Sequence, residues 1–473
     1  MTDLAWITAA EAVSLMTRRK LSPVEYLDAL LARAEAQSER LNPFAFVAAD
    51  RARDEAKQAE AALAKGEDLG PLAGLPMHVK DLFPTAGIPT EYGSATKAGT
   101  IPEADDILVT RLREAGSVIF AKSTTPEFGH KGQTDGPHFG TTRNPWDTTR
   151  YAGGSSGGAA CAVAAGIGPL GLGTDGAGSI RIPAAACGLV GLKPTVGLLP
   201  YGEAGEAFGN VAAAGPLART VEDAALMITA LAGADDCDPW SLSAPEPLAT
   251  RAGRTLHGLR VGYIPKFCNA RVSADVEANT KAVLDGLAAR GAVIEEVTDP
   301  VDWIEYEGRV LYQVNIAMGF GPLVDRWGNQ MDPVLLGFIE RGRGFTIEDY
   351  RKAMLARTRL FRAVQALFTR YDVLISPTVT RTALPADFEA LDGQVMVDGH
   401  ENGLTRQGMS PYCYPFNLTG HPALALPSGF ARDGLPTSVQ FIGPYHTDLD
   451  LLALAATVEE DRPWAHLRPA GLD

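Results

Sequence analysis

The chain has 473 residues, 46% of them hydrophobic, with a formal net charge of −15 and a pI near 5.1. This composition supports a sizeable core, in either one large domain or roughly two to three small ones. The acidic charge argues against nucleic acid and against anionic membranes as partners, because both repel a negatively charged protein. We therefore expect a soluble protein with neither kind of partner.

The cysteines and the N-terminus indicate a cytoplasmic protein. The five cysteines are scattered, with no Cys-x-x-Cys pair, which fits reduced thiols better than a disulfide framework or a zinc site. No apolar stretch precedes Arg18–Lys20, so we expect no signal peptide. The longest apolar run, Ala159–Gly173, is too short for a membrane span and predicts a buried helix that leads into a strand.

Two helices are predicted near the N-terminus. The first covers residues 22–38, with Ser22 as its N-cap, Pro23 in the first helical position and Glu25 completing a capping box. The second covers residues 51–65 and ends at Gly66 in the C′ position.

From residue 74 onward the chain alternates short apolar runs with Gly and Pro. Val118–Phe120 and Val261–Ile264 are predicted to be buried strands, each followed by a more helical stretch. This alternation favours an α/β core.

A long helix is predicted to begin at Thr346, with Asp349 as its capping partner, and to lead into a strand at Val373–Ile375. The Pro-rich stretches near residues 238–250 and 384–386 are interpreted as loops, not as interdomain linkers.

Two glycine-rich segments carry serines that are candidates for catalysis. They are Gly153–Gly158, with Ser155 and Ser156 at its centre, and Gly173–Arg181, which contains Ser179. Glycine allows close backbone approach to a ligand and positive φ. With Lys80 upstream, these segments supply a serine, a helper serine and a lysine, which suffice for nucleophilic catalysis without histidine.

The local sequence around Ser179 allows two roles. A serine hydroxyl is a poor nucleophile without a base, but the backbone of Gly176–Ser179 can present consecutive N–H groups to an oxyanion. Ser179 also lies at a predicted strand-to-helix junction, because Ala184–Ala186 favour a helix. An N-cap role is therefore equally good on local sequence alone.

Two shorter motifs favour other chemistries but lack the required context. Gly153–Gly157 matches the G-x-S-x-G elbow of α/β-hydrolases, which needs a preceding strand, whereas Asn144–Arg150 is turn-like. Gly171–Gly176 matches G-x-G-x-x-G, but residues 177–202 contain no acidic residue for a ribose. No His, Cys and Asp cluster has metal-ligand spacing, so we expect no cofactor and no metal.

Taken together, the motifs resemble the amidase signature family. The family order of segments is met by Lys80-Asp81, Gly153–Gly158 and Gly173–Pro183, and family-like segments extend from Lys122 to Pro444. The resemblance implies an α/β fold with a central mixed β-sheet covered by helices on both faces. It implies one domain over residues 1–473, with a signature core at about 74–200 and a more variable, substrate-facing part at about 240–420.

The resemblance also implies the roles of three residues. Ser179 is the nucleophile, Ser155 relays its proton across a loop whose preceding peptide bond is cis, and Lys80 is the base. To act as a base Lys80 must be neutral, so burial should lower its pKa.

Further site residues follow from the same resemblance. The substrate-binding and oxyanion group comprises Gly176, Ala177, Gly178 and Gly129. The supporting group comprises Ser156, Asp175 and Arg181. Ala177 stands where many relatives have glycine, and it tolerates positive φ less well. Independently of the resemblance, Tyr92, Phe128, His130 and His138 lie in loops next to the motifs. They are candidates for the pocket wall, although a purely structural role fits each of them equally well.

The expected function is cofactor-independent hydrolysis of carboxamide C–N bonds, linear or cyclic, through an acyl-enzyme on Ser179, with esters or carbamates as side substrates. An alternative is a glutamine amidotransferase subunit that supplies ammonia to a tRNA-charging complex. A non-catalytic binding protein on the same scaffold is disfavoured by the intact Lys80, Ser155 and Ser179. The identity of the small amide substrate is not readable from these residues, and a homodimer is left open.

Overall fold

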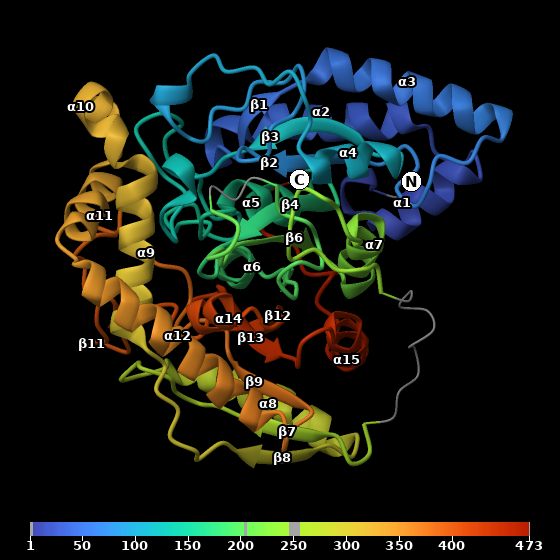
Figure 1. Cartoon of the computed structure of the whole chain (residues 1–473). Coiled ribbons are helices and arrows are strands. Elements are labelled where there is room, and N and C mark those ends of the chain that lie inside the picture. Colours follow the sequence, from blue (N-terminus) through green and yellow to red (C-terminus); the bar gives the residue numbers. More distant parts are fainter. Residues whose placement is uncertain (1–2, 203–205, 246–255, 473) are drawn as a thin grey trace.

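The computed structural model describes residues 3–202, 206–245 and 256–472. One mixed sheet of eleven strands runs through them in the order β1-β3-β2-β4-β6-β5-β12-β13-β9-β7-β8, from β1 at the top of Figure 1 to β8 at the bottom. Its strands are β1 (Phe44–Val47), β2 (Pro76–Lys80), β3 (Val118–Ser123), β4 (Leu170–Asp175), β5 (Val190–Lys193), β6 (Ala213–Ala218), β7 (Arg260–Tyr263), β8 (Val293–Glu296), β9 (Val373–Pro377), β12 (Ala423–Phe430) and β13 (Pro436–Ile442). A separate two-stranded sheet pairs β10 (Met396–Val397) with β11 (His400–Glu401).

The direction of strand pairing changes along the sheet. Strands β3, β2 and β4 pair in parallel, and so do β9, β7 and β8. Between these parallel ends the pairing is antiparallel from β4 through β6, β5, β12 and β13 to β9. Every residue of β2 to β6 is buried, as is typical of strands that are covered on both faces.

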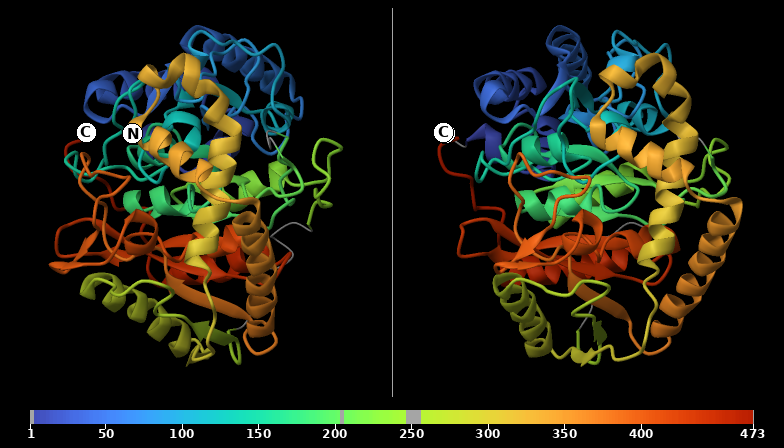
Figure 2. Two further views of the ribbon diagram at one scale, coloured as in Figure 1. Left: turned by 60° about the vertical axis from the view of Figure 1, so that its left-hand side comes forward. Right: turned by 90° about the vertical axis from the view of Figure 1, so that its left-hand side faces the viewer.

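Helices cover both faces of this sheet. They are α1 (Ala9–Thr17), α2 (Pro23–Leu41), α3 (Ala49–Lys65), α4 (Ile107–Glu114), α5 (Gly157–Ala164), α6 (Arg181–Cys187), α7 (Val221–Leu231), α8 (Ala274–Ala289), α9 (Glu305–Phe320), α10 (Val324–Trp327), α11 (Pro333–Arg343), α12 (Ile347–Leu367), α13 (Thr405–Gly408), α14 (Tyr414–Thr419) and α15 (Asp448–Asp461). Figure 2 shows α8 on one side of the β7–β8 end and α12 on the other. The predicted α/β fold with a central mixed sheet is confirmed.

The two faces of the sheet carry separate hydrophobic cores. Along β3, Ile119 packs in one core and Val118 and Phe120 in the other, because successive side chains of a strand point to opposite faces. Met77 and Val79 of β2 join the core of Ile119. The alternation therefore turns Lys80, at the end of β2, towards the face that α5 and α6 cover.

The predicted N-terminal helices form with small differences. Helix α2 begins at Pro23 after Ser22, whose hydroxyl accepts the N–H of Val24 at 3.1 Å and of Glu25 at 3.2 Å. The return bond from Glu25 that a capping box requires is not formed in the described part of the chain, so that prediction is wrong. Helix α3 begins at Ala49 and ends before Gly66, which has φ 81°.

The predicted strands also form, and so does the buried helix α5 that leads into β4. The expectation of a more helical stretch after each strand holds for β7, for which α8 is the next element, but is wrong for β3. Residues 124–156 instead form a long loop with a 3₁₀ turn at Glu127–Gly129. Within this loop, Gly154 packs closely against Gly132 and Gln133. The described residues of the predicted loop 238–250 are irregular, and residues 246–250 lie outside the described part.

Helix α12 allows a test of its N-terminal cap. Thr346 Oγ1 accepts the N–H of Asp349 at 3.1 Å, and Asp349 accepts the N–H of Thr346 at 2.9 Å. Thr346→Ala should lower the free energy of unfolding by about 0.5–2 kcal/mol, because it leaves a helix-end N–H unpaired. Denaturant unfolding measures this. Thr358→Ala, an exposed change within the same helix, is the control and should be neutral or stabilising. Equal losses in the two variants would contradict the capping role.

Candidate active site

The amine of Lys80 lies buried among three hydroxyl groups. Its side chain is 0% exposed, and Nζ lies 2.7 Å from Ser155 Oγ, 3.0 Å from Ser156 Oγ and 2.8 Å from Thr174 Oγ1. Burial lowers the pKa of Lys80 well below its usual value, although the negative charge of Asp175 opposes this shift. The site therefore favours a neutral amine that can accept a proton.

Ser155 and Ser156 lie in a tight loop just before α5. The Gly154–Ser155 peptide bond is cis, as the sequence resemblance implied. Ser156 ties this loop to its surroundings, since its hydroxyl donates to the carbonyl of Thr174 at 3.1 Å and its N–H donates to the carbonyl of Ser179 at 3.1 Å. Both serines are thus held between the end of β4 and the turn that carries Ser179.

Two glycines allow the close packing of this loop. A Cβ on Gly154 would lie 2.4 Å from the backbone nitrogen of Gln133, and one on Gly173 would lie 2.8 Å from Ser156 Oγ. Such distances are shorter than side-chain carbon atoms tolerate. Gly154 is therefore required by contact with a neighbouring backbone segment, and Gly173 by contact with the Ser156 side chain.

Ser179 lies between the end of β4 and the start of α6, as predicted. The N-cap position of α6 is Ile180, and no side chain caps this helix. The alternative that Ser179 serves as an N-cap is therefore wrong. Its side chain is half-buried and lines a cavity that Ser155 also lines. Within the described residues its hydroxyl has no hydrogen-bond partner, so it is open to the cavity.

A buried ion pair supports the turn around Ser179. Arg181 donates to Asp175 through Nε and through a terminal nitrogen, each at 2.9 Å. The other terminal nitrogen donates to Gln440 at 2.8 Å, and Asn417 accepts from Arg181 at 2.6 Å. Burial raises the pKa of Asp175, but the Arg181 charge and the hydrogen bonds from Arg181 and Asn417 outweigh burial and hold this pKa below its usual value.

The same carboxylate shapes the backbone that was expected to bind an oxyanion. Asp175 accepts the N–H of Gly178 at 2.6 Å and that of Ile180 at 3.1 Å. The Gly178 N–H is thus already bonded. The N–H groups of Gly176 and Ala177 have no acceptor in the described part of the chain. Ala177 is not among the residues with positive φ, so its methyl group does not strain the turn.

The cavity next to these residues has a volume of about 250 Å³. Gly129 lies in its wall, and a Cβ there would be 3.3 Å from Ser155 Oγ. Of the other candidate wall residues, Phe128 and His130 line the cavity. Tyr92 and His138 do not, and His138 instead contacts Glu91 at 2.6 Å. The structure therefore places Gly129, Ser155, Gly176, Ala177 and Ser179 in the wall of one cavity. The other predicted residues of the site do not line it: Lys80 and Ser156 bond to wall residues, and Asp175 bonds to Gly178 and Arg181.

Sequence reasoning missed three residues of the site. Thr174, which contacts Lys80, stands inside a quoted motif, so its position was a usable signal. Gln440 lies in one of the quoted family-like segments. Asn417 gave no signal, because it lies 236 positions from Arg181 in the chain. Only the fold brings these two side chains together.

Neither a metal cluster nor a membrane-spanning helix is found in the described part of the chain. Among residues 3–202, 206–245 and 256–472, no group of three or more His, Cys, Asp or Glu side chains is placed to hold a metal ion. Across the same residues, no helix is both long enough and apolar enough to cross a membrane.

Comparisons with known proteins identify relatives over nearly the whole chain. A family model described as Amidase matches residues 25–452. An acylamidase of Rhodococcus erythropolis is 35% identical and aligns over 99% of this chain and 98% of its own length. A glutamyl-tRNA(Gln) amidotransferase subunit of Moorella thermoacetica is also 35% identical, over 99% of each chain. The solved structure of a bacterial aryl acylamidase of the amidase signature enzymes has a TM-score of 0.90, with 29% identity and 97% of both chains covered.

The buried ion pair yields a stability prediction. Asp175→Asn should destabilise the protein by about 3–5 kcal/mol, because it leaves the charge of Arg181 buried without a partner. Thermal and denaturant unfolding measure this loss. The matched control is Asp392→Asn in the exposed pair that Asp392 makes with Arg341 at 2.6 Å, where a loss of at most about 1 kcal/mol is expected. Similar losses at both pairs would contradict the supporting role of Asp175.

Proposed function

The chain belongs to the amidase signature family of hydrolases that act on amides, and from this premise we propose that it cleaves carboxamide C–N bonds through an acyl-enzyme on Ser179. In this proposal Ser155 relays protons and Lys80 is the base. The observation that carries it is the buried contact of 2.7 Å between Lys80 Nζ and Ser155 Oγ, beside the cavity that Ser155 and Ser179 share.

The hydrogen bonds of Lys80 support the direction of proton transfer. The Ser156 hydroxyl donates its hydrogen to the carbonyl of Thr174. Towards Lys80 the Ser156 oxygen is therefore an acceptor, and it accepts an N–H of the amine. The second N–H of a neutral amine goes to the hydroxyl of Thr174. The remaining lone pair then faces Ser155, whose O–H donates to it. The oxygen of Ser155 is left to accept the proton of Ser179.

Acylation follows from this arrangement. Ser179 Oγ attacks the amide carbon while its proton moves to Ser155 and the proton of Ser155 moves to Lys80. The N–H groups of Gly176 and Ala177 stabilise the negative charge that develops on the carbonyl oxygen. The C–N bond breaks as a proton returns through Ser155 to the leaving nitrogen. A water molecule then attacks the ester by the same relay and releases the acid.

The wall of the cavity supports a small amide with an apolar part as substrate. Apolar and aromatic side chains line it, among them Phe128, Tyr312, Ile316 and Phe338. Three of these belong to the stretch of about 240–420, whereas the reacting groups belong to the core of about 74–200. We therefore propose that the single domain 1–473 consists of a catalytic core and a substrate-facing part. We also propose that esters and carbamates are side substrates.

The similarity to an amidotransferase subunit makes glutamine-dependent release of ammonia a second candidate. The charged side chains in the cavity wall are Lys131 and Arg406, both cations. Among the described residues of this wall, no carboxylate is present to bind the α-ammonium group of glutamine, which favours the free-standing amidase. Ammonia release from glutamine, together with co-purification of partner subunits, would favour the amidotransferase instead.

The nucleophile is tested by Ser179→Ala. This variant should fold normally but lose both amide turnover and covalent labelling by a fluorophosphonate, because one exposed hydroxyl is removed from a small turn. Mass spectrometry of the labelled peptide identifies the modified residue. Ser410→Ala is the matched control, since Ser410 also lines the cavity and lies outside the relay. Its label should remain on Ser179. Near-normal turnover by Ser179→Ala would exclude Ser179 as the nucleophile.

The base is tested at Lys80. Lys80→Ala should slow acylation by at least ~10²–10⁴-fold, and Lys80→Arg should not restore it, since a guanidinium stays charged. In the unmodified protein, kcat/KM should fall on the acid side, because Lys80 acts only above its lowered pKa, where it is neutral.

A charged Lys80 that only pairs with a carboxylate would give the opposite pattern. Lys80→Arg would then recover much of the activity. Lys131→Arg serves as the control, because Lys131 is a charged partner of Asp332 at 2.7 Å, and arginine should replace it with little loss of fluorophosphonate labelling.

A further inference from the structure

The guanidinium of Arg406 lies in the cavity wall without an acceptor. Its side chain is half-buried on α13 and lines the cavity. It lies 4.6 Å from the ring centre of Tyr312 and 5.5 Å from that of Tyr414. In the described part of the chain no oxygen accepts a hydrogen bond from it and no carboxylate lies within ion-pair distance. The two aromatic contacts stabilise its charge but occupy none of its five N–H groups as an oxygen would.

The neighbouring charges are already paired. Lys131, the other cation of the wall, bonds to Asp332 at 2.7 Å and Asp135 at 3.1 Å. Glu305, a carboxylate close enough to act on the Arg406 charge, contacts Arg309 at 3.3 Å. Among the described residues of the wall, the positive charge of Arg406 is therefore the one that remains open to a ligand.

The rings beside Arg406 are held in place. The Tyr312 hydroxyl donates to the carbonyl of His130, and the Tyr414 hydroxyl donates to the carbonyl of Trp303 at 2.8 Å. Fixed rings restrict where the guanidinium can move. A cation that is partly removed from water without an acceptor is costly, and a bound anion would remove that cost.

We propose that Arg406 is a specificity-determining residue that binds a carboxylate of the substrate, so that the preferred substrates are amides carrying a carboxylate away from the scissile bond. A guanidinium matches a carboxylate with two parallel hydrogen bonds. The apolar wall that includes Ile316 and Phe338 would hold the part of the substrate between the two groups. This inference rests on the proposed amidase function, and it assigns a substrate carboxylate to the Arg406 side of the cavity.

Binding to the Ser179→Ala protein tests this without turnover. Calorimetry compares two pairs of ligands. In the first pair the carboxylate is on the acyl side: glutaryl anilide against the neutral methyl ketone 5-oxohexanoyl anilide. In the second pair it is on the amine side: 4-(hexanoylamino)benzoate against 4-(hexanoylamino)acetophenone. In at least one pair the carboxylate should bind about tenfold or more tightly, as expected for a charge-assisted double hydrogen bond.

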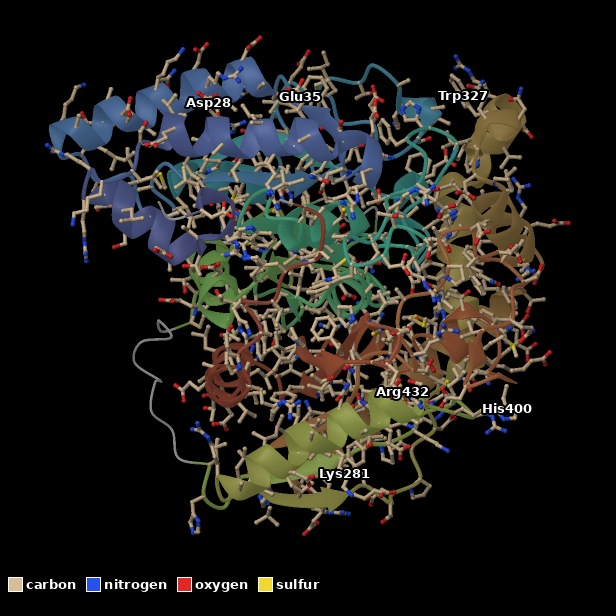
Figure 3. The ribbon with its side chains drawn as sticks, turned by 180° about the vertical axis from the view of Figure 1, so that it is seen from behind. Asp28, Glu35, Lys281, Trp327, His400 and Arg432 are labelled. Carbon is tan, nitrogen blue, oxygen red and sulfur yellow. The ribbon has the colours of Figure 1, made fainter. Side chains whose placement is uncertain are left out.

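Variants of Arg406 made in the Ser179→Ala protein show whether Arg406 causes the preference for the carboxylate ligand. Arg406→Gln should remove it and leave the binding of the neutral ligand unchanged, and Arg406→Lys should keep part of it. The matched control is Arg326→Gln. Arg326 also contacts an aromatic ring, Trp327, at 5.0 Å, but it lies on α10 at the outer edge of the molecule, where Figure 3 labels Trp327. This control should keep the full preference.

Two outcomes would overturn the inference. One is the absence of any carboxylate preference in both pairs. The other is equal weakening of charged and neutral ligands by Arg406→Gln, which would make Arg406 a structural residue. If Arg406→Gln does not fold, Arg406→Lys decides, since an unchanged preference there would exclude the double hydrogen bond. Loss of the proposed function would be seen separately, as fluorophosphonate labelling at a residue other than Ser179.

Discussion

The site depends on burying one lysine amine where water cannot solvate an ammonium ion. Lys80 is brought there by strand alternation, because Met77 and Val79 occupy the core on the opposite face of the sheet. Around its nitrogen the fold places hydroxyl groups in positions that suit a neutral amine. Burial disfavours the charged form, and the hydroxyl groups satisfy the neutral one. In the proposed mechanism this burial allows Lys80 to act as a base for a serine that has no histidine partner.

A second buried interaction holds the turn that carries Ser179. The Asp175–Arg181 pair closes the turn around Ser179, and Arg181 extends it to Asn417 and Gln440 in the C-terminal part of the chain. Removing one partner of such a pair lowers the stability of the protein strongly, because the other charge is left buried without a partner. The pair therefore links the glycine-rich core to the distant segments that complete the cavity. Because Asp175 also opposes the pKa shift of Lys80, the same carboxylate that orders the turn limits how far the amine is neutralised.

Much of this site could be predicted because its residues lie in short motifs. Ser155 and Ser179 stand in glycine-rich segments, where close contacts at Gly154 and Gly173 leave no room for a side chain. Lys80 is recognisable from the Lys80-Asp81 segment upstream of them. The contact of Asn417 with Arg181 could not be predicted, since it depends on the order of strands in the sheet. The prediction of a helical stretch after β3 is wrong, because the course of a loop depends on the segments against which it packs and not on its local sequence pattern. The hydrogen bond from the N–H of Gly178 to Asp175 could likewise not be predicted, because it depends on the geometry of the turn.

In the proposed mechanism Lys80 is neutral in the working protein. A pH titration of lysine side-chain nitrogens by NMR tests this in ¹⁵N-lysine-labelled protein, with the Lys80 resonance assigned from its absence in Lys80→Arg. We predict that Lys80 loses its proton well below the ordinary lysine value of about 10.4, and that this transition follows the acid limb of kcat/KM. A Lys80 resonance that titrates at the ordinary value, with activity already full at lower pH, would contradict it.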